Sequence, residues 1–187
     1  MKSMVEFFLG CLLTLLIGCG TSQTKVSSAE NSALNGIMSS QSFEIVCDVA
    51  EPQVTNGMNA IANAGLLPMG STVGSISLIG NSNFFRMEND TISAYLPYFG
   101  ERQMGGGYNG TDGIAIQFNG VPSDLAVEHG KNNTYDIYFD ISDEKSSSER
   151  YSVYVKVYSN LTSSIRINSN QHFPISYRGN ITKKEKI

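Results

Sequence analysis

Apolar and polar residues alternate along most of the chain after residue 73. Such alternation places apolar side chains on one face of a β-strand and polar side chains on the other. Clusters of Gly, Asn, Asp and Ser separate the alternating stretches and predict turns between them. The predicted strands are 43–49, 73–80, 83–89, 91–96, 114–120, 124–130, 135–141, 151–158, 164–169 and 173–181.

The number and spacing of these stretches predict a mainly β protein. The expected fold is a single antiparallel β-sandwich or open barrel of about 8–10 strands. One short N-terminal helix is predicted by apolar residues at roughly helical spacing: Ala29, Ala33, Leu34, Ile37 and Met38. Residues 51–72 are rich in Pro, Gly, Asn and Ala, and their apolar middle, MNAIANAGLLPMG, is expected to lie against the protein as a lid or a short helix.

One hairpin is predicted down to its register. The stretches 135–141 and 151–157 flank the polar loop SDEKSSSER, and one register pairs apolar residues on one face and aromatic or oppositely charged residues on the other. The predicted pairs are Ile137–Val155, Phe139–Val153, Tyr138–Tyr154 and Asp136–Lys156.

A second hairpin follows from the same reasoning. It sets Val157 opposite Ile165 across a turn at residues 160–162. It also sets Lys156 beside Arg166, a repulsion that Asp136 would have to relieve.

The N-terminus, MKSMVEFFLGCLLTLLIGCG, predicts export and a lipid anchor. Its apolar run from Phe7 to Ile17 is shorter than the ~20 residues that span a bilayer as a helix, and it follows the positive charge of Lys2, so residues 1–18 are expected to be a signal peptide. The string LIGC resembles the bacterial lipobox, in which the cysteine receives the lipid after processing. Cys19 is therefore the expected lipid attachment site, with a plain secretory signal as the alternative.

The remaining chain divides into three parts by composition. Residues 19–32, which begin with the lipidated cysteine, are small and polar and predict a flexible tether. Residues 33–182 are expected to form the single β-rich domain, and 183–187 form a short charged tail. Gly20 rather than an aspartate follows the cysteine, which favours an outer-membrane lipoprotein on the periplasmic face of the cell envelope.

Charge and cysteine content exclude several classes of partner. The net charge is −4 and the chain has no basic stripe, so nucleic acid is not an expected partner. Cys47 is the one thiol left after processing and lipidation, which rules out a thiolate zinc site. Its place on the apolar face of the strand FEIVCDV, with Phe43, Ile45 and Val49, favours a buried core residue over a reactive thiol.

Catalytic and metal-binding motifs point to no activity. His129 and His172 have no metal-ligand spacing and are expected at the surface, and no GxSxG motif is present. Residues 105–110 match GxGxxG by letters but precede a strand instead of a helix, so they do not predict a dinucleotide site. The acidic loop 140–149 lacks Ca²⁺-loop spacing. No catalytic residue, metal or cofactor is therefore expected.

The stretch SAYLPYFG is the main candidate for a binding site. Pro97 marks the end or edge of a strand because it has no N–H to donate. The surrounding aromatic rings either close one end of the core or form an aromatic rim, gated by the following glycine-rich loop, where a ligand or partner docks. The candidate binding residues are Tyr95, Tyr98, Phe99 and Tyr108.

Three stretches together resemble a known family. ISAYLPYFG, GYNGTDGIAIQF and SIRINSNQHFPISYRGNI occur in the order found in Bacteroides-type lipoproteins of domain-of-unknown-function family 4251, over about residues 30–182. The resemblance implies a single β-rich extracytoplasmic domain behind a lipobox. It supplies no catalytic residues, because the family has no assigned activity. The apolar insertion at 60–69 is longer than the loop expected for the family.

These observations favour a non-enzymatic binding or interaction module of the cell envelope. Its expected partners are the membrane, through the lipid on Cys19, and a small ligand or another envelope protein. One alternative is a structural or assembly factor that docks on an envelope protein through the outer face of Tyr138, Tyr154 and Tyr158. A second alternative is a glycan-acting enzyme, which would need two carboxylates about 5–10 Å apart in a cleft.

Overall fold

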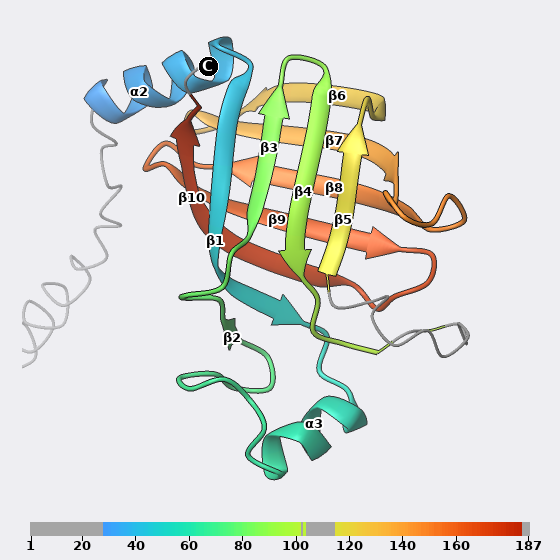
Figure 1. Cartoon of the computed structure of the whole chain (residues 1–187). Helices are drawn as coiled ribbons and strands as arrows, with labels where there is room; N and C mark the ends of the chain where they lie inside the picture. Colours follow the sequence, from blue (N-terminus) through green and yellow to red (C-terminus); the bar gives the residue numbers. More distant parts are fainter. Residues whose placement is uncertain (1–27, 102, 104–114, 185–187) are drawn as a thin grey trace, which may run out of the picture.

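A computed structural model describes residues 28–101, 103 and 115–184. Within these residues the chain forms two helices and ten strands (Figure 1). The elements in chain order are α2 (Ser28–Ser39), β1 (Ser42–Pro52), α3 (Asn56–Asn63), β2 (Ile76–Ser77), β3 (Phe84–Glu88), β4 (Thr91–Pro97), β5 (Ala115–Gly120), β6 (Ser123–Gly130), β7 (Thr134–Ser142), β8 (Arg150–Val157), β9 (Thr162–Ser169) and β10 (Ile175–Lys183).

All ten strands belong to one antiparallel sheet. Nine of them follow the order β5-β4-β3-β1-β10-β9-β8-β7-β6, and the short β2 pairs with β1 beside this path. The sheet curls into a half-barrel, with α2 at one end and α3 with β2 at the other (Figure 1). The predicted mainly β fold with a short N-terminal helix is confirmed, in the form of an open barrel.

Aromatic side chains fill the interior of the half-barrel. The Phe85 ring lies 6.4 Å from Phe43, 6.4 Å from Phe118 and 6.1 Å from Phe139, measured between ring centroids. Phe118 also contacts Tyr151, with centroids 6.0 Å apart. The rings come from strands on both arms of the curled sheet, so their burial holds the two arms together.

The register of the β7–β8 hairpin is the predicted one. Ile137 pairs with Val155 and Tyr138 with Tyr154, and the other two predicted pairs also form. Ile137 and Val155 are fully buried, whereas Tyr138 faces solvent. Apolar packing and the polar face therefore agree on one register.

The predicted register of the β8–β9 hairpin is wrong by two residues. Val157 pairs with Ser163 instead of Ile165, and Lys156 pairs with Ser164, so Lys156 does not lie directly opposite Arg166. The cause is the turn, which closes earlier through a bond from the Tyr158 N–H to the Thr162 carbonyl. A shift of two residues keeps every side chain on its face, so alternation alone does not distinguish the two registers.

A β-bulge in β1 changes which residues of this strand face the core. The register against β10 shifts between Cys47 and Val49. Cys47 is buried as predicted, but Ala50 takes the next inward position and Val49 is half-exposed, contrary to the prediction. Opposite Cys47 lies Gly179, where an added Cβ would lie 2.0 Å from the Val46 carbonyl oxygen.

Both ends of the described chain are more regular than the composition suggests. The N-terminal helix α2 begins at Ser28, inside the segment expected to be a tether, and it buries Leu34 against the core. At the other end β10 includes Lys183, and the Lys184 ammonium pairs with the Glu88 carboxylate at 2.6 Å. Regular secondary structure therefore begins at Ser28 and ends at Lys183 among the described residues.

Candidate functional site

The aromatic residues of SAYLPYFG lie in different surroundings. Tyr95 faces solvent on β4, whereas Tyr98, just after this strand, is half-buried. The Tyr98 hydroxyl lies within hydrogen-bonding distance of the carbonyls of Glu101, at 3.0 Å, and Phe173, at 3.2 Å. Burial, with smaller effects of nearby carboxylates, raises the pKa of Tyr98 to about 12. The Tyr98 hydroxyl is therefore occupied by hydrogen-bonding contacts within the protein.

A buried pair of hydrogen-bonded side chains, His172 and Glu149, supports Tyr98. The His172 ring packs edge-on against Tyr98, with ring centroids 4.7 Å apart. His172 Nδ1 lies 2.5 Å from Glu149 Oε1, and the Ser169 hydroxyl donates to the same carboxylate oxygen at 2.7 Å. Both His172 and Glu149 are buried, so the prediction of a surface His172 is wrong. The hydrogen-bonding partner Glu149 explains its burial, because a buried imidazole needs such a partner.

Phe99 also packs against the core, and Tyr108 lies outside the described residues. Tyr95 is thus exposed, whereas Tyr98 and Phe99 pack against the core. Together with the bond from the Tyr177 hydroxyl to the Pro97 carbonyl, at 3.0 Å, these contacts match the interpretation in which the stretch closes one end of the core. His129, by contrast, is exposed as predicted.

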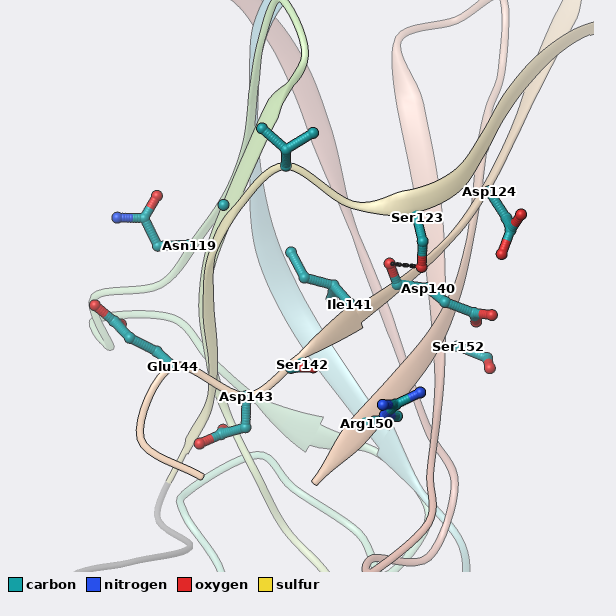
Figure 2. A pocket seen from close by; sticks show the side chains of 12 residues that line it. Asn119, Ser123, Asp124, Asp140, Ile141, Ser142, Asp143, Glu144, Arg150 and Ser152 are labelled. Carbon is teal, nitrogen blue, oxygen red and sulfur yellow. Dashed lines mark hydrogen bonds between the residues drawn. The ribbon is translucent and has the colours of Figure 1, made fainter. Parts of the chain in front are cut away.

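A hollow on another side of the molecule brings together polar side chains from several strands and their connections. It has a volume of about 620 Å³ and lies between the β5–β6 connection and the β7–β8 hairpin (Figure 2). Its lining comprises Asn119, Gly120, Val121, Ser123, Asp124, Asp140, Ile141, Ser142, Asp143, Glu144, Arg150 and Ser152. Asp124, Asp140 and Ser152 lie at one end in Figure 2, and Asn119 and Glu144 lie at the other.

A second hollow of about 280 Å³ adjoins the first. Its lining comprises Asp124, Tyr138, Phe139, Asp140, Ser152, Val153, Tyr154 and Asn168. Three residues, Asp124, Asp140 and Ser152, line both hollows, so the two form one continuous depression. We call this depression, with the residues that line it, the β7–β8 groove.

The backbone builds the polar wall of the groove at the open seam of the half-barrel. The register between β6 and β7 shifts between Ser123 and Ala126, and Asp124 has a positive φ of 54°. This bulge lets the Ser123 hydroxyl reach the Asp140 carbonyl at 3.3 Å. Asp124 and Asp140 are both exposed, so their carboxylates are accessible to a ligand.

The other wall of the groove is aromatic. Tyr138 and Tyr154 are cross-strand neighbours whose rings stack at 4.8 Å with an interplanar angle of 19°. The Tyr154 hydroxyl donates to Asp136 at 2.5 Å, and the Lys156 ammonium lies 3.0 Å from the same carboxylate. Burial raises the pKa of Asp136, but these two hydrogen bonds and the charge of Lys156 outweigh it and hold the pKa below its usual value. The ring positions are thus held by a polar network.

The remaining charged groups of the groove differ in availability. Asp143 accepts the N–H groups of Lys145 and Ser146 and the hydroxyl of Tyr151, at 2.8, 2.9 and 2.8 Å, and so shapes the β7–β8 turn. Burial and the bond to Asp143 raise the pKa of Tyr151. Glu144 and Arg150 are exposed. Among the described residues no cluster of three or more His, Cys, Asp or Glu side chains has the arrangement of a metal site.

The sequence patterns predicted the aromatic wall of this groove but not its polar wall. The cross-strand alternation predicted the outward Tyr138 and Tyr154, but the groove also needs Asp124 and Asp140. Asp124 and Asp140 come together through a bulge in β6. The alternation of apolar and polar residues does not reveal an extra residue in a strand.

A comparison of the sequence with family models decides its relationship. The model described as "Domain of unknown function (DUF4251)" matches residues 25–181. The chain belongs to the DUF4251 family. The match runs from just before α2 into β10, two residues short of its end, so it includes the other strands of the half-barrel and all residues that line the groove.

A solved structure of another family member has the same fold. The crystal structure of a DUF4251 family protein from Bacteroides eggerthii DSM 20697 aligns with a TM-score of 0.54 and 12% sequence identity. The alignment covers 86% of this chain and 92% of that chain. No curated protein matched the sequence in a separate search. Within the described residues of this DUF4251 protein, no helix is long and apolar enough to cross a membrane.

Proposed function

We propose that this DUF4251 protein is a lipid-anchored, non-enzymatic binding module of the cell envelope, and that its ligand occupies the β7–β8 groove. The observation that carries the proposal is the continuity of the two hollows, one with an aromatic wall and one with a polar wall. Binding sites commonly combine an apolar surface with a few polar groups that orient the ligand.

The filled interior supports an external site. Side chains of Phe43, Phe85, Phe118 and Phe139 occupy the space that holds the ligand in barrel proteins with a hollow centre. The proposed ligand therefore binds on the outer surface, where the groove combines exposed carboxylates, a guanidinium and tyrosine rings.

The chemistry of the walls favours a ligand with an apolar ring face and several hydroxyl groups, as saccharides have. The C–H face of a sugar ring packs on an aromatic ring such as Tyr138, which is 42% exposed. Asp124 and Asp140 accept hydrogen bonds from hydroxyl groups, and Arg150 donates them. The groove thus offers both kinds of contact that such a ligand needs.

The exposure of the carboxylates supports binding over hydrolysis. A glycosidase needs a carboxylic acid whose pKa is raised by burial so that it donates a proton near neutral pH. Asp124 and Asp140 are exposed at the rim of the groove and do not lie in such a buried pocket. We therefore assign these residues to ligand contact.

The ligand is tested with native mass spectrometry on residues 19–187 carrying Cys19→Ser. The probe is a pool of oligosaccharides released from the cell envelope of the producing bacterium. We expect discrete bound masses that disappear in Tyr138→Ala and in Asp140→Asn, with the exposed Val46→Ala on β1 as a folded control. Binding unchanged in both groove variants contradicts the proposal, as does an absence of any bound mass. Shortened oligosaccharides after incubation would instead identify the glycan-acting enzyme.

Anchoring is tested separately on the full-length chain. The LIGC string and the apolar run before it support lipidation of Cys19 and an outer-membrane location. The N-terminal peptide of the purified protein is expected to carry the mass of a diacylglyceryl cysteine with an acylated amino group. Cys19→Ser should lose this mass and release the protein from outer-membrane fractions. An unmodified Cys19 in the wild-type protein would contradict lipidation and would indicate a plain secretory signal peptide.

The outward tyrosines also favour a second candidate, docking on another envelope protein. Tyr138 and Tyr158 are 42% and 37% exposed, a large aromatic surface for a protein face. Chemical crosslinking in cells separates the two functions, because a stable complex lost in Tyr158→Ala but not in Asp140→Asn indicates protein docking.

A further inference from the structure

One end of the half-barrel is built from a stretch of chain without charge. Residues 52–83 contain no Asp, Glu, Lys, Arg, His or aromatic residue, in a chain whose charged residues make up 16% of the total. This uncharged segment includes α3 and β2 and projects beyond the end of the sheet opposite α2 (Figure 1). It also contains the apolar insertion at 60–69.

The uncharged segment concentrates exposed apolar side chains. Five of the eleven large hydrophobic residues that are exposed in the described structure belong to it: Val54, Ile61, Leu66, Met69 and Ile79. Met69 is 97%, Ile79 82% and Leu66 72% exposed. Single exposed hydrophobic residues are ordinary, but a group of them on one projection is typical of an interaction surface.

Buried residues and hydrogen bonds hold this projection in place. Met58 of α3 and Ile76 of β2 are buried in the core, so the exposed residues between them belong to an anchored unit. The Thr55 side chain caps α3, and the Glu101 carboxylate accepts the Thr55 hydroxyl at 2.8 Å and the Gly57 N–H at 3.0 Å. An anchored surface loses little conformational freedom on binding, which favours association.

The composition of the segment argues against a bilayer as its partner. Peripheral membrane surfaces combine apolar residues with Lys or Arg for anionic headgroups and with Trp or Tyr at the interface. The uncharged segment has none of these four residue types.

Charge favours a second copy of the same chain. In a two-fold symmetric interface the same surface patch meets itself, so a charged residue close to the axis lies beside its own copy. This protein carries a net charge of −4, and the uncharged segment offers a surface on which two acidic copies meet without such repulsion. The exposed side chains present roughly several hundred Å² of apolar surface per copy, which approaches the area of a standard interface.

We infer that this protein forms a homodimer through the uncharged segment, with Leu66, Met69 and Ile79 buried between the two copies. The inference is independent of the groove, since the dimer would form at the end of the barrel whether or not the groove binds a ligand. Anchoring of both copies on one membrane would raise their effective concentration and so favour a weak pairing.

Sedimentation of residues 19–187 carrying Cys19→Ser tests the dimer at concentrations up to about 100 µM. The wild type is expected to dimerise with increasing concentration. Leu66→Asp and Met69→Asp each place charges at the axis and should weaken dimerisation at least about a hundredfold. The matched control is Val127→Asp on the edge strand β6, which likewise replaces an exposed apolar side chain by Asp and should dimerise as the wild type does.

Cysteine crosslinking in the full-length, membrane-anchored protein gives a second readout. Met69→Cys is expected to form a disulfide-linked dimer under mild oxidation, while Val127→Cys is not, and the buried Cys47 does not interfere. A wild type that stays monomeric at all concentrations and a Met69→Cys variant that crosslinks no more than Val127→Cys would overturn the inference. Dimers unaffected by Leu66→Asp and Met69→Asp would overturn it equally. Circular dichroism confirms that the variants remain folded.

Discussion

The backbone N–H of Glu144, in the turn after β7, donates a hydrogen bond to the Gln117 carbonyl on β5 at 2.9 Å. Gln117 lies on one edge strand of the open sheet, and Glu144 belongs to the hairpin beside the other edge. The bond therefore crosses the seam that a closed barrel would fill with a strand ladder. It fixes the hairpin whose outer side forms the β7–β8 groove, so the seam and the groove depend on each other.

The position of Tyr98 predicts a structural role for this residue. Tyr98→Ala should lower the free energy of unfolding by about 3 kcal/mol, because it removes a packed ring and the hydrogen bond to the backbone. Tyr95→Ala, at an exposed site on the same stretch, should cost less than about 1 kcal/mol. Urea denaturation measures both, and equal losses would speak against Tyr98 as a plug of the core.

Gly179 is predicted to tolerate no side chain. An added Cβ would lie 2.0 Å from the Val46 carbonyl oxygen and 2.6 Å from the Cys47 Cα, both of them backbone atoms. Gly179→Ala should therefore lower the free energy of unfolding by about 3 kcal/mol or more. Gly120→Ala, where the structure leaves open space, is the control and should change it by no more than about 0.5 kcal/mol.

Cys47 should be inert in the folded protein. Burial, with a smaller effect of Asp48, raises the pKa of its thiol to about 12, so at pH 8 about one molecule in ten thousand carries a thiolate. In residues 19–187 with Cys19→Ser, Cys47 is the sole thiol. Iodoacetamide should label it in guanidinium but not in buffer, as followed by mass spectrometry. Rapid labelling in buffer would show that the β1 bulge opens readily.

The Asp136 network should make stability depend on pH in the acid range. The folded pKa of Asp136 lies below its unfolded value, so its stabilisation is present above the unfolded pKa, about 4, and is lost as pH falls through the folded pKa. At pH 7, Asp136→Asn should therefore lower the free energy of unfolding by about 1–2 kcal/mol. The difference from the wild type should shrink below about pH 4. A constant difference from pH 7 to pH 2 would contradict this coupling.

The strands and one complete register were predictable because alternation reports which face of a strand is buried. In the β7–β8 hairpin, which pairs Ile137 with Val155, the apolar residues of one face and the aromatic and charged residues of the other each had to match across the strands. Only one register met both requirements. The β8–β9 hairpin had no such second constraint, because Ser163 and Ser164 fit either face. Its turn, with Leu161 at a positive φ of 64°, decided the register instead.

The candidate site was predictable in part for a related reason. Tyr138 and Tyr154 follow from pairing, a local property of two adjacent strands. The burial of His172 depends on Glu149, and the groove depends on Asp124 and Asp140, which approach through the bulge in β6. Such contacts arise from the curvature of the sheet and the positions of its bulges, which no single stretch of sequence encodes.

The pairing of β1 with β10 at the centre of the sheet has a consequence for biogenesis. The first strand of the domain finds its main neighbour only when the last strand is present, and β3 alone does not complete the core beside it. Contacts between such distant parts of a chain form slowly. A chain that waits for its final strand therefore completes its core only after β10 has been synthesised.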